Sequence, residues 1–144
     1  MLIPGTNGGK MSKSANNVIN IFLDDKALRK QIMSIETDST PLEDPKNPDT
    51  CNAFAIYKLL ATEAQITTMR ANYLGGNYGY GHAKQALFEL IVGKFKTERE
   101  RYNYYINNLT EVDSLLKQGA EKAAGIANGV LDRVRLKLGF ESLQ

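Results

Sequence analysis

The sequence predicts an all-α protein, a helical bundle of about five helices that follows an N-terminal loop rich in glycine and lysine. Three observations support this fold class. Apolar residues recur at helical spacing in several long segments, polar residues suited to cap helices precede them, and glycines follow two of them. The chain has 144 residues and 42% hydrophobic content, which is enough for one domain with its own core.

The N-terminal part of the chain, residues 1–23, is predicted to form the loop and a connecting segment. Pro4 and Gly5 end a short apolar stub, as the two strongest turn-forming residues do. The apolar run 18–23 is compatible with a brief strand or with an irregular packed segment. Residues 24–144 are assigned to one C-terminal helical domain.

Each expected helix has a polar start and an apolar stripe. Asp24 or Asp25 caps the first, Thr62 with Gln65 matches a capping box for the third, and Thr110 caps the last. In order, the helices are expected near residues 25–36, 49–61, 63–74, 82–108 and 111–138.

Turn-forming and small residues separate or mark these helices. Proline, serine, threonine and aspartate between residues 37 and 48 predict a long surface connection, and Gly75-Gly76 stops the third helix. Gly93 is a weak point within the fourth helix. The last helix carries a long apolar stripe from Val112 to Leu138, with small residues that allow a neighbouring helix to approach closely.

Composition excludes several classes of function. Eighteen lysines and arginines against sixteen aspartates and glutamates are too balanced to indicate nucleic-acid binding by themselves. With Cys51 the sole cysteine and His82 the sole histidine, we expect neither an intrachain disulfide nor a metal site. Cys51 is interpreted as a small packing residue of the second helix. No long apolar run or signal peptide is evident, so a soluble cytoplasmic protein is expected, with no membrane partner.

The most specific stretch is residues 8–14, Gly-Gly-Lys-Met-Ser-Lys-Ser. It combines backbone N–H groups at close range, hydroxyl donors and mobile ammonium groups, which is the chemistry that binds a polyphosphate. The spacing differs from GxxxxGK[ST], so a P-loop NTPase is excluded. The alternative is that these residues form only a solvated loop.

A second basic cluster lies in the fourth expected helix and alternates with glutamates. It is the best local candidate for contact with an RNA backbone, although such charged faces are usually only solvated. Tyr102 and Tyr105 share the helical spacing of the apolar stripe there and are interpreted as core or core-edge residues rather than base-stacking residues. The basic residues are Lys94, Lys96, Arg99 and Arg101.

Residues 10–14 read KMSKS, the second signature of the class I aminoacyl-tRNA synthetases. Further segments in the same order resemble the C-terminal part of the bacterial tryptophanyl-tRNA synthetases more than the related tyrosyl family. The resemblance covers nearly the whole chain. These segments are Asn16-Asn17-Val18-Ile19, Thr37-Asp38-Ser39, the turn 73–81, residues 98–102 and residues 119–123.

The resemblance implies an aminoacyl-tRNA ligase that activates tryptophan with ATP and transfers it to tRNA(Trp). Lys10 and Lys13 would be the catalytic residues that stabilise the ATP phosphates in the transition state. Met11, Ser12 and Ser14 would complete the ATP-binding loop. The cofactor would be ATP with Mg²⁺ and no tightly bound group, and the complete enzyme would be a cytoplasmic homodimer.

The chain departs from the family in one respect. The signature HIGH needs two histidines, and this sequence contains only His82. The resemblance therefore implies a C-terminal fragment without the Rossmann-like catalytic domain, inactive by itself. Two alternatives stay open: a fragment of a tyrosyl-type synthetase, and an independent helical module that binds RNA or another protein.

Overall fold

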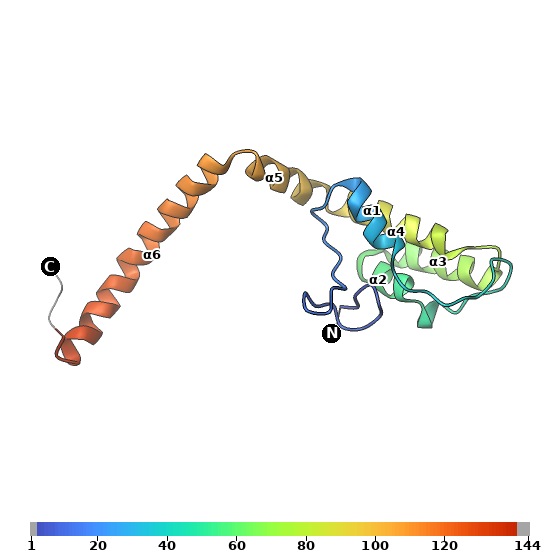
Figure 1. Cartoon of the computed structure of the whole chain (residues 1–144), viewed down its shortest axis with the longest axis horizontal. Helices are drawn as coiled ribbons and strands as arrows, with labels where there is room; N and C mark the ends of the chain where they lie inside the picture. The colour runs from blue at the N-terminus through green and yellow to red at the C-terminus, as the bar shows by residue number, and fades with distance from the viewer. Residues whose placement is uncertain (1–2, 141–144) are drawn as a thin grey trace. The chain divides into compact units, whose positions relative to one another are not determined.

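The structure, a computed structural model, describes residues 3–140. The described part contains no β-strand, only an isolated antiparallel bridge between Pro4 and Lys10. The predicted all-α class is confirmed (Figure 1). The elements are α1 (Asp25–Met33), a 3₁₀ turn η1 (Pro48–Thr50), α2 (Asn52–Leu60), α3 (Glu63–Gly75), α4 (Tyr80–Lys94), α5 (Lys96–Ile106) and α6 (Leu109–Lys137).

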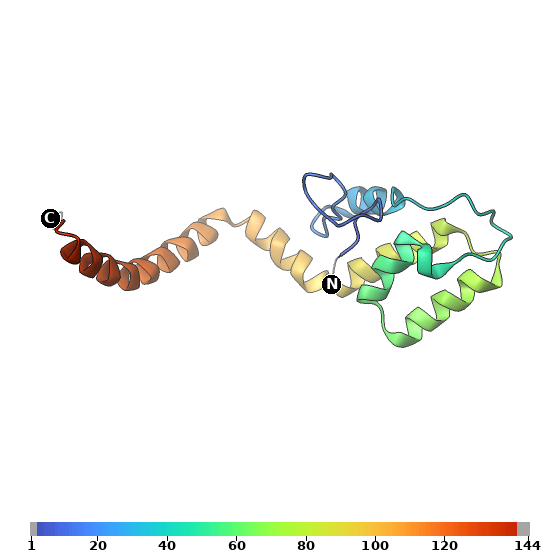
Figure 2. The same ribbon diagram turned by 90° about the horizontal axis from the view of Figure 1, so that it is seen from below.

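The chain divides into two compact units, one up to Glu100 and one from Arg101 onward. In the first unit α1 and α2 both pack against α4, as Figures 1 and 2 show from two sides. The apolar faces of these helices and of α3 form the core. Its largest fully buried side chains are Tyr73, Phe54, Leu28, Ile32, Ile35, Leu87 and Ile91.

Local sequence signals account for the starts and ends of the first helices. The Asp24 carboxylate accepts from the Ala27 N–H at 2.9 Å and caps α1. Thr62 and Gln65 form the predicted capping box of α3. Gly76 ends α3 with a φ of 72°, a conformation that side chains with a Cβ rarely adopt.

Three predicted helices begin or continue differently. The helix expected near 49–61 begins at Asn52, after η1, so Cys51 lies at its N-cap and not within it. The helix expected near 82–108 is two helices, because Phe95 leaves helical geometry with a φ of −103° and a ψ of 20°. This break follows Gly93, the predicted weak point, by two residues. The cap of α6 is Asn108 and not Thr110, which lies inside the helix.

The connection 37–48 lies mostly on the surface, as predicted, but Lys46 within it is buried. Lys46 is 2% exposed and donates to three backbone oxygens, those of Pro41 at 2.7 Å, Leu42 at 3.1 Å and Asp44 at 3.0 Å. Its ammonium supplies the donors that this turn-rich backbone cannot obtain from a helix or sheet.

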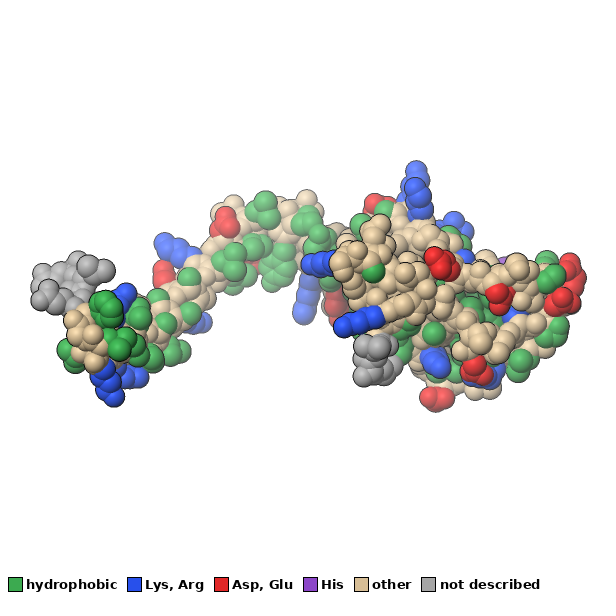
Figure 3. Space-filling view, turned by 60° about the horizontal axis from the view of Figure 1, so that its bottom comes forward, with side chains coloured by type: hydrophobic (Ala, Val, Ile, Leu, Met, Phe, Trp, Pro, Cys, Tyr) green, Lys and Arg blue, Asp and Glu red, His purple; other side chains and the backbone are tan. Residues whose placement is uncertain are grey.

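The apolar side chains of residues 101–140 are not buried within the described part of the chain. Tyr102 and Tyr105, predicted as core or core-edge residues, are each 40% exposed, and no residue of α6 is buried. Figure 3 shows hydrophobic side chains on the surface of α6. Helical periodicity correctly predicted an amphipathic helix, but periodicity carries no information on what covers the apolar face.

Candidate phosphate-binding site

The loop that carries residues 10–14 is closed at its base by backbone hydrogen bonds. The Gly5 N–H donates to the Gly9 carbonyl at 2.7 Å, and the Met11 N–H donates to that of Ile3 at 2.9 Å. Gly8 has a φ of 76°, and a Cβ there would lie 2.5 Å from the Asn52 side chain. The loop therefore needs glycine for a tight turn against the start of α2.

The base of the loop is tied to the helices around it. The Thr6 carbonyl accepts from the Glu36 N–H at 2.8 Å, just after α1, and Asn52 Nδ2 donates to the Glu36 carbonyl at 3.0 Å. Gly5, at the base of the loop, is buried. The reason is Asn17, whose side chain would lie 2.4 Å from a Cβ at residue 5.

Both predicted catalytic lysines are exposed. Among the described residues, no ion pair or hydrogen bond involves the ammonium group of Lys10 or Lys13. A turn follows Lys13, in which its carbonyl accepts from the Asn16 N–H at 3.1 Å and Asn16 adopts a φ of 51°. Both cations are thus available for an external anion.

The two serines of the loop share a hydrogen bond. Ser12 Oγ and Ser14 Oγ lie 2.8 Å apart, and Ser12 Oγ also accepts from the Ala15 N–H at 3.2 Å. Both hydroxyls lie on the turn that presents Lys13. A hydroxyl can rotate its donor toward a new acceptor, so this arrangement is compatible with donation to a phosphate oxygen.

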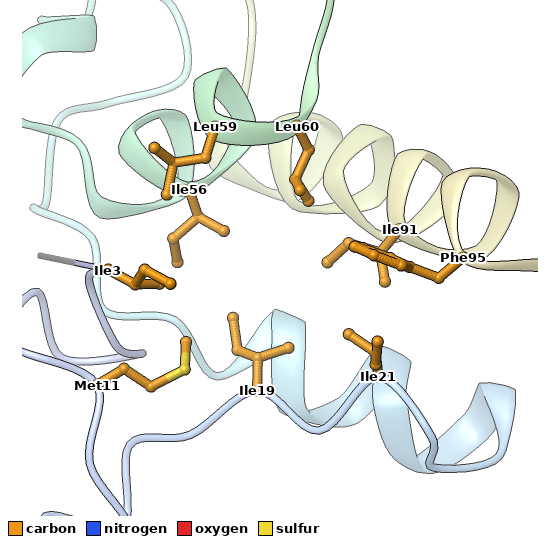
Figure 4. Close-up of a pocket in the computed structure, with 9 residues that line it drawn as sticks. All are labelled: Ile3, Met11, Ile19, Ile21, Ile56, Leu59, Leu60, Ile91 and Phe95. Carbon is orange, nitrogen blue, oxygen red and sulfur yellow. The ribbon is translucent and has the colours of Figure 1, made fainter. Parts of the chain in front are cut away.

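Met11 lies between Lys10 and Ser12 and packs against the hydrophobic core. Its side chain lines an open pocket of about 500 Å³, shown in Figure 4, together with apolar residues of the connecting segment, α2 and α4. Met11 thereby anchors the loop to the core. The lining contains no ionisable side chain, so this pocket is unsuited to a polyphosphate.

A smaller pocket of about 270 Å³ adjoins the loop. Gly8, Gly9 and Lys10 line one part of it, and Lys58 of α2 lines another part. Two lysines beside a glycine backbone suit an anionic group. Lys58 was not among the predicted site residues, because it stands 48 residues after Lys10 in an ordinary helical pattern.

Asn17 is the second residue that sequence reasoning missed as part of the site. It is 2% exposed, and its amide makes three hydrogen bonds to the loop. Asn17 belongs to a segment that resembles the family, but nothing in the sequence indicated that an asparagine so close to an exposed loop would be buried.

The four basic residues proposed for RNA contact differ in the contacts that they make within the chain. Arg99 donates to Asp25 Oδ1 and to the Ile21 carbonyl, each at 2.5 Å. Lys94 Nζ donates to the Leu60 carbonyl at 2.8 Å. Lys96 lies 3.9 Å from Glu100, and Arg101 is exposed.

Cys51 and His82 do not form a catalytic pair. Cys51 is buried and lies 3.2 Å from Tyr73 Oη, while His82 stacks against Tyr78 with ring centroids 5.6 Å apart. Residues 3–140 contain no cluster of His, Cys, Asp or Glu side chains able to hold a metal ion. None of their helices is long and apolar enough to cross a membrane.

The loop sequence and its placement on a helical unit agree with comparisons to known proteins. The profile of the family described as tRNA synthetases class I (W and Y) matches residues 1–96. The chain belongs to this family. The match covers the first compact unit almost completely, and it includes the whole loop.

Bacterial relatives within the class I synthetases extend the similarity. The tryptophan–tRNA ligase of Rhodopirellula baltica is 42% identical over 96% of this chain, and that of Fusobacterium nucleatum is 47% identical over 88%. The crystal structure of the Campylobacter jejuni tryptophanyl-tRNA synthetase, complexed with ADP and tryptophan, matches 97% of this chain with a TM-score of 0.93 and 43% identity. The chain spans less than half the length of these relatives, 43%, 38% and 44% respectively.

Proposed function

We propose that this chain is part of a tryptophan–tRNA ligase, in which it supplies the loop that binds the phosphates of ATP. The observation that carries the proposal is the arrangement of Lys10 and Lys13, two exposed ammonium groups without protein partners on a loop fixed at its base. The names of the relatives support tryptophan as the amino acid, because they are tryptophan–tRNA ligases at 42% and 47% identity.

The proposed reaction has two steps. A carboxylate oxygen of tryptophan attacks the α-phosphorus of ATP, the bond to the bridging oxygen breaks, and pyrophosphate leaves. A hydroxyl of the terminal ribose of tRNA(Trp) then attacks the activated carbonyl, and AMP leaves. Mg²⁺ would arrive with ATP as part of the substrate, since it prefers phosphate oxygens and water to an all-protein site.

In the first step negative charge grows on the departing pyrophosphate. Preorganised cations lower this barrier electrostatically, without any proton transfer. Lys10 and Lys13 provide these charges, and Lys58 supplies a third cation beside the same glycines. Ser12 and Ser14 donate to phosphate oxygens, while Met11 holds the loop against the core.

The remaining parts of the proposal concern the complete protein. We infer that it is a cytoplasmic homodimer and that the helices contact tRNA. Within the basic cluster, the better candidates for that contact are the exposed residues Lys94, Lys96 and Arg101. Arg99 is a weaker candidate, because its guanidinium is already hydrogen-bonded to Asp25.

The test uses a chimera, defined as the Campylobacter jejuni enzyme with its matching segment replaced by this chain. We expect the chimera to exchange pyrophosphate into ATP when tryptophan is present. Loss of all exchange by a folded chimera would contradict the proposal. The 144-residue chain alone is the control. It should be inactive, because its single histidine cannot form the HIGH signature, which needs two.

A further inference from the structure

Asn17 is one of two buried polar or charged side chains in the described part of the chain, and it lies directly beneath the exposed lysine loop. Its Oδ1 accepts from the Ser12 N–H at 2.8 Å. Its Nδ2 donates to the Lys10 carbonyl at 3.1 Å and to Asn7 Oδ1 at 2.7 Å. All of its side-chain hydrogen bonds therefore go to the loop.

The two backbone contacts require opposite chemistry. The Ser12 N–H can only donate, and the Lys10 carbonyl can only accept, so the side chain between them must offer an acceptor and a donor together. A carboxamide does this, whereas the carboxylate of aspartate has no hydrogen to donate. Both hydrogens of Nδ2 are already used, so Asn17 has no donor left for a substrate.

The contacts also fix both sides of the loop. Lys10 and Ser12 flank Met11, so Asn17 holds the backbone on either side of the residue that packs into the core. The Asn17 carbonyl accepts from the Thr6 N–H at 3.0 Å, and Gly5 leaves room for this approach. Loss of the amide would free the backbone from which Lys10 and the turn of Lys13 project.

We propose that Asn17 is a positioning residue for adenylate formation, acting through the placement of Lys10 and Lys13 and not by contact with ATP. The inference rests on the proposed function of the loop. Cations stabilise a transition state only where they already stand at the developing charge, and a displacement of about 1 Å can cost about a hundredfold in rate.

The primary test compares Asn17→Asp with Asn20→Asp in the chimera. Asn20 is exposed, lies in the same connecting segment, and uses its Oδ1 to accept from the Phe22 N–H at 3.0 Å, a bond that aspartate can keep. We expect single-turnover adenylate formation to fall by about ten- to a hundredfold in Asn17→Asp, with a smaller change in the ATP dissociation constant. Asn20→Asp should stay within about twofold of the unmodified chimera.

A second measurement separates positioning from general destabilisation. In a background that already carries Lys10→Ala and Lys13→Ala, Asn17→Asp should slow the reaction by no more than about twofold to threefold, because the groups that it places are gone. Equal losses in both backgrounds would overturn the proposal. Equal rates for the Asn17→Asp and Asn20→Asp chimeras would overturn it too, while the proposed function would stand.

Asn17→Ser provides a neutral variant if the buried carboxylate prevents folding. The variant keeps the backbone hydrogen bond to Thr6. Its shorter side chain cannot hydrogen-bond the Ser12 N–H and the Lys10 carbonyl together. We expect exchange of the Ser12 amide hydrogen in the 144-residue chain to speed up by about tenfold or more, with the amides of α4 unchanged. An unchanged rate of hydrogen exchange at the Ser12 amide would contradict the inference. If the unmodified chimera showed no tryptophan-dependent pyrophosphate exchange, the proposed function and this inference would both be overturned.

Discussion

The Arg99 guanidinium is paired with the Asp25 carboxylate at 2.5 Å, and this pair joins the start of α5 to the first turn of α1. Arg99 also donates to the Ile21 carbonyl in the segment that follows the lysine loop. The side chain of Arg99 is 13% exposed, and that of Asp25 is 67% exposed. An arginine that could contact RNA by sequence pattern therefore has a structural role.

Replacement of Arg99 should reduce stability. We expect Arg99→Ala to lower the free energy of unfolding by about 1 to 2 kcal/mol, because it leaves the Ile21 carbonyl and Asp25 without their donor. Arg101→Ala, at an exposed position two residues away, should change it by less than about 0.5 kcal/mol. Urea unfolding of the two variants measures the difference, and equal stabilities would show that the Arg99 contacts contribute little.

Lys46 should be more important for stability than an ordinary surface lysine. Lys46→Met keeps most of the side-chain volume but removes the donor to three backbone oxygens, so we expect a loss of about 2 to 4 kcal/mol. Lys26→Met, on the exposed face of α1, is the matched control and should be near neutral. A Lys46→Met protein as stable as its control would mean that water satisfies those oxygens equally well.

The two glycines at the end of α3 should respond in opposite ways to alanine. At Gly76 a Cβ would lie 2.5 Å from the Glu43 carbonyl oxygen, and the φ of 72° is itself unfavourable, so Gly76→Ala should cost about 2 kcal/mol or more. At Gly75 nothing lies within 4 Å of the position of a Cβ. Gly75→Ala should be neutral or slightly stabilising, and thermal unfolding of both variants checks the contrast.

Tyr80 and Asp38 should make stability depend on pH at both extremes. Tyr80 Oη donates to Asp38 Oδ1 at 2.6 Å. Burial and this hydrogen bond raise the pKa of Tyr80 to about 12, and hydrogen bonds from Thr40 and Tyr80 lower the pKa of Asp38. Because the folded pKa of Tyr80 is raised, its contribution is complete below its ordinary value of 10.0 and is lost as the pH rises toward about 12.

At low pH, the dependence of folding stability on pH has the opposite sign. Because the folded pKa of Asp38 is lowered, its contribution is present above the ordinary carboxyl pKa and is lost as the pH falls through the folded value. Tyr80→Phe removes the shared hydrogen bond, so the variant should show a weaker dependence in both ranges. Urea unfolding across pH tests this, and parallel curves for the two proteins would show that the pair is not coupled to folding.

Sequence reasoning predicted the features that depend on near neighbours along the chain. The cap at Asp24, the capping box of Thr62 and the stop at Gly76 follow from side chains within a few residues of the backbone groups they satisfy. The loop could likewise be recognised, because Lys10 to Ser14 form a contiguous motif.

The other features depend on contacts between distant segments or on the path of irregular backbone. Lys58 reaches the loop pocket only because α2 packs beside it, and the helical pattern around Lys58 is that of any solvated lysine. Asn17 and Lys46 are buried because they bond to nearby backbone groups of irregular segments that have no helix or sheet partner, and composition and periodicity do not reveal this. The exposed stripe of α6 has the same origin, since a period shows which residues share a face and not what meets that face.

In the proposed function, Lys13 acts on the transition state of amino-acid activation. In the chimera, Lys13→Ala should slow single-turnover formation of tryptophanyl-adenylate by on the order of a hundredfold, about 3 kcal/mol, with a much smaller change in the dissociation constant of ATP. Lys26→Ala on α1 is the control and should leave both quantities unchanged. A near-normal rate in Lys13→Ala with a raised ATP dissociation constant would contradict the claim, because Lys13 would then bind ground state and transition state equally.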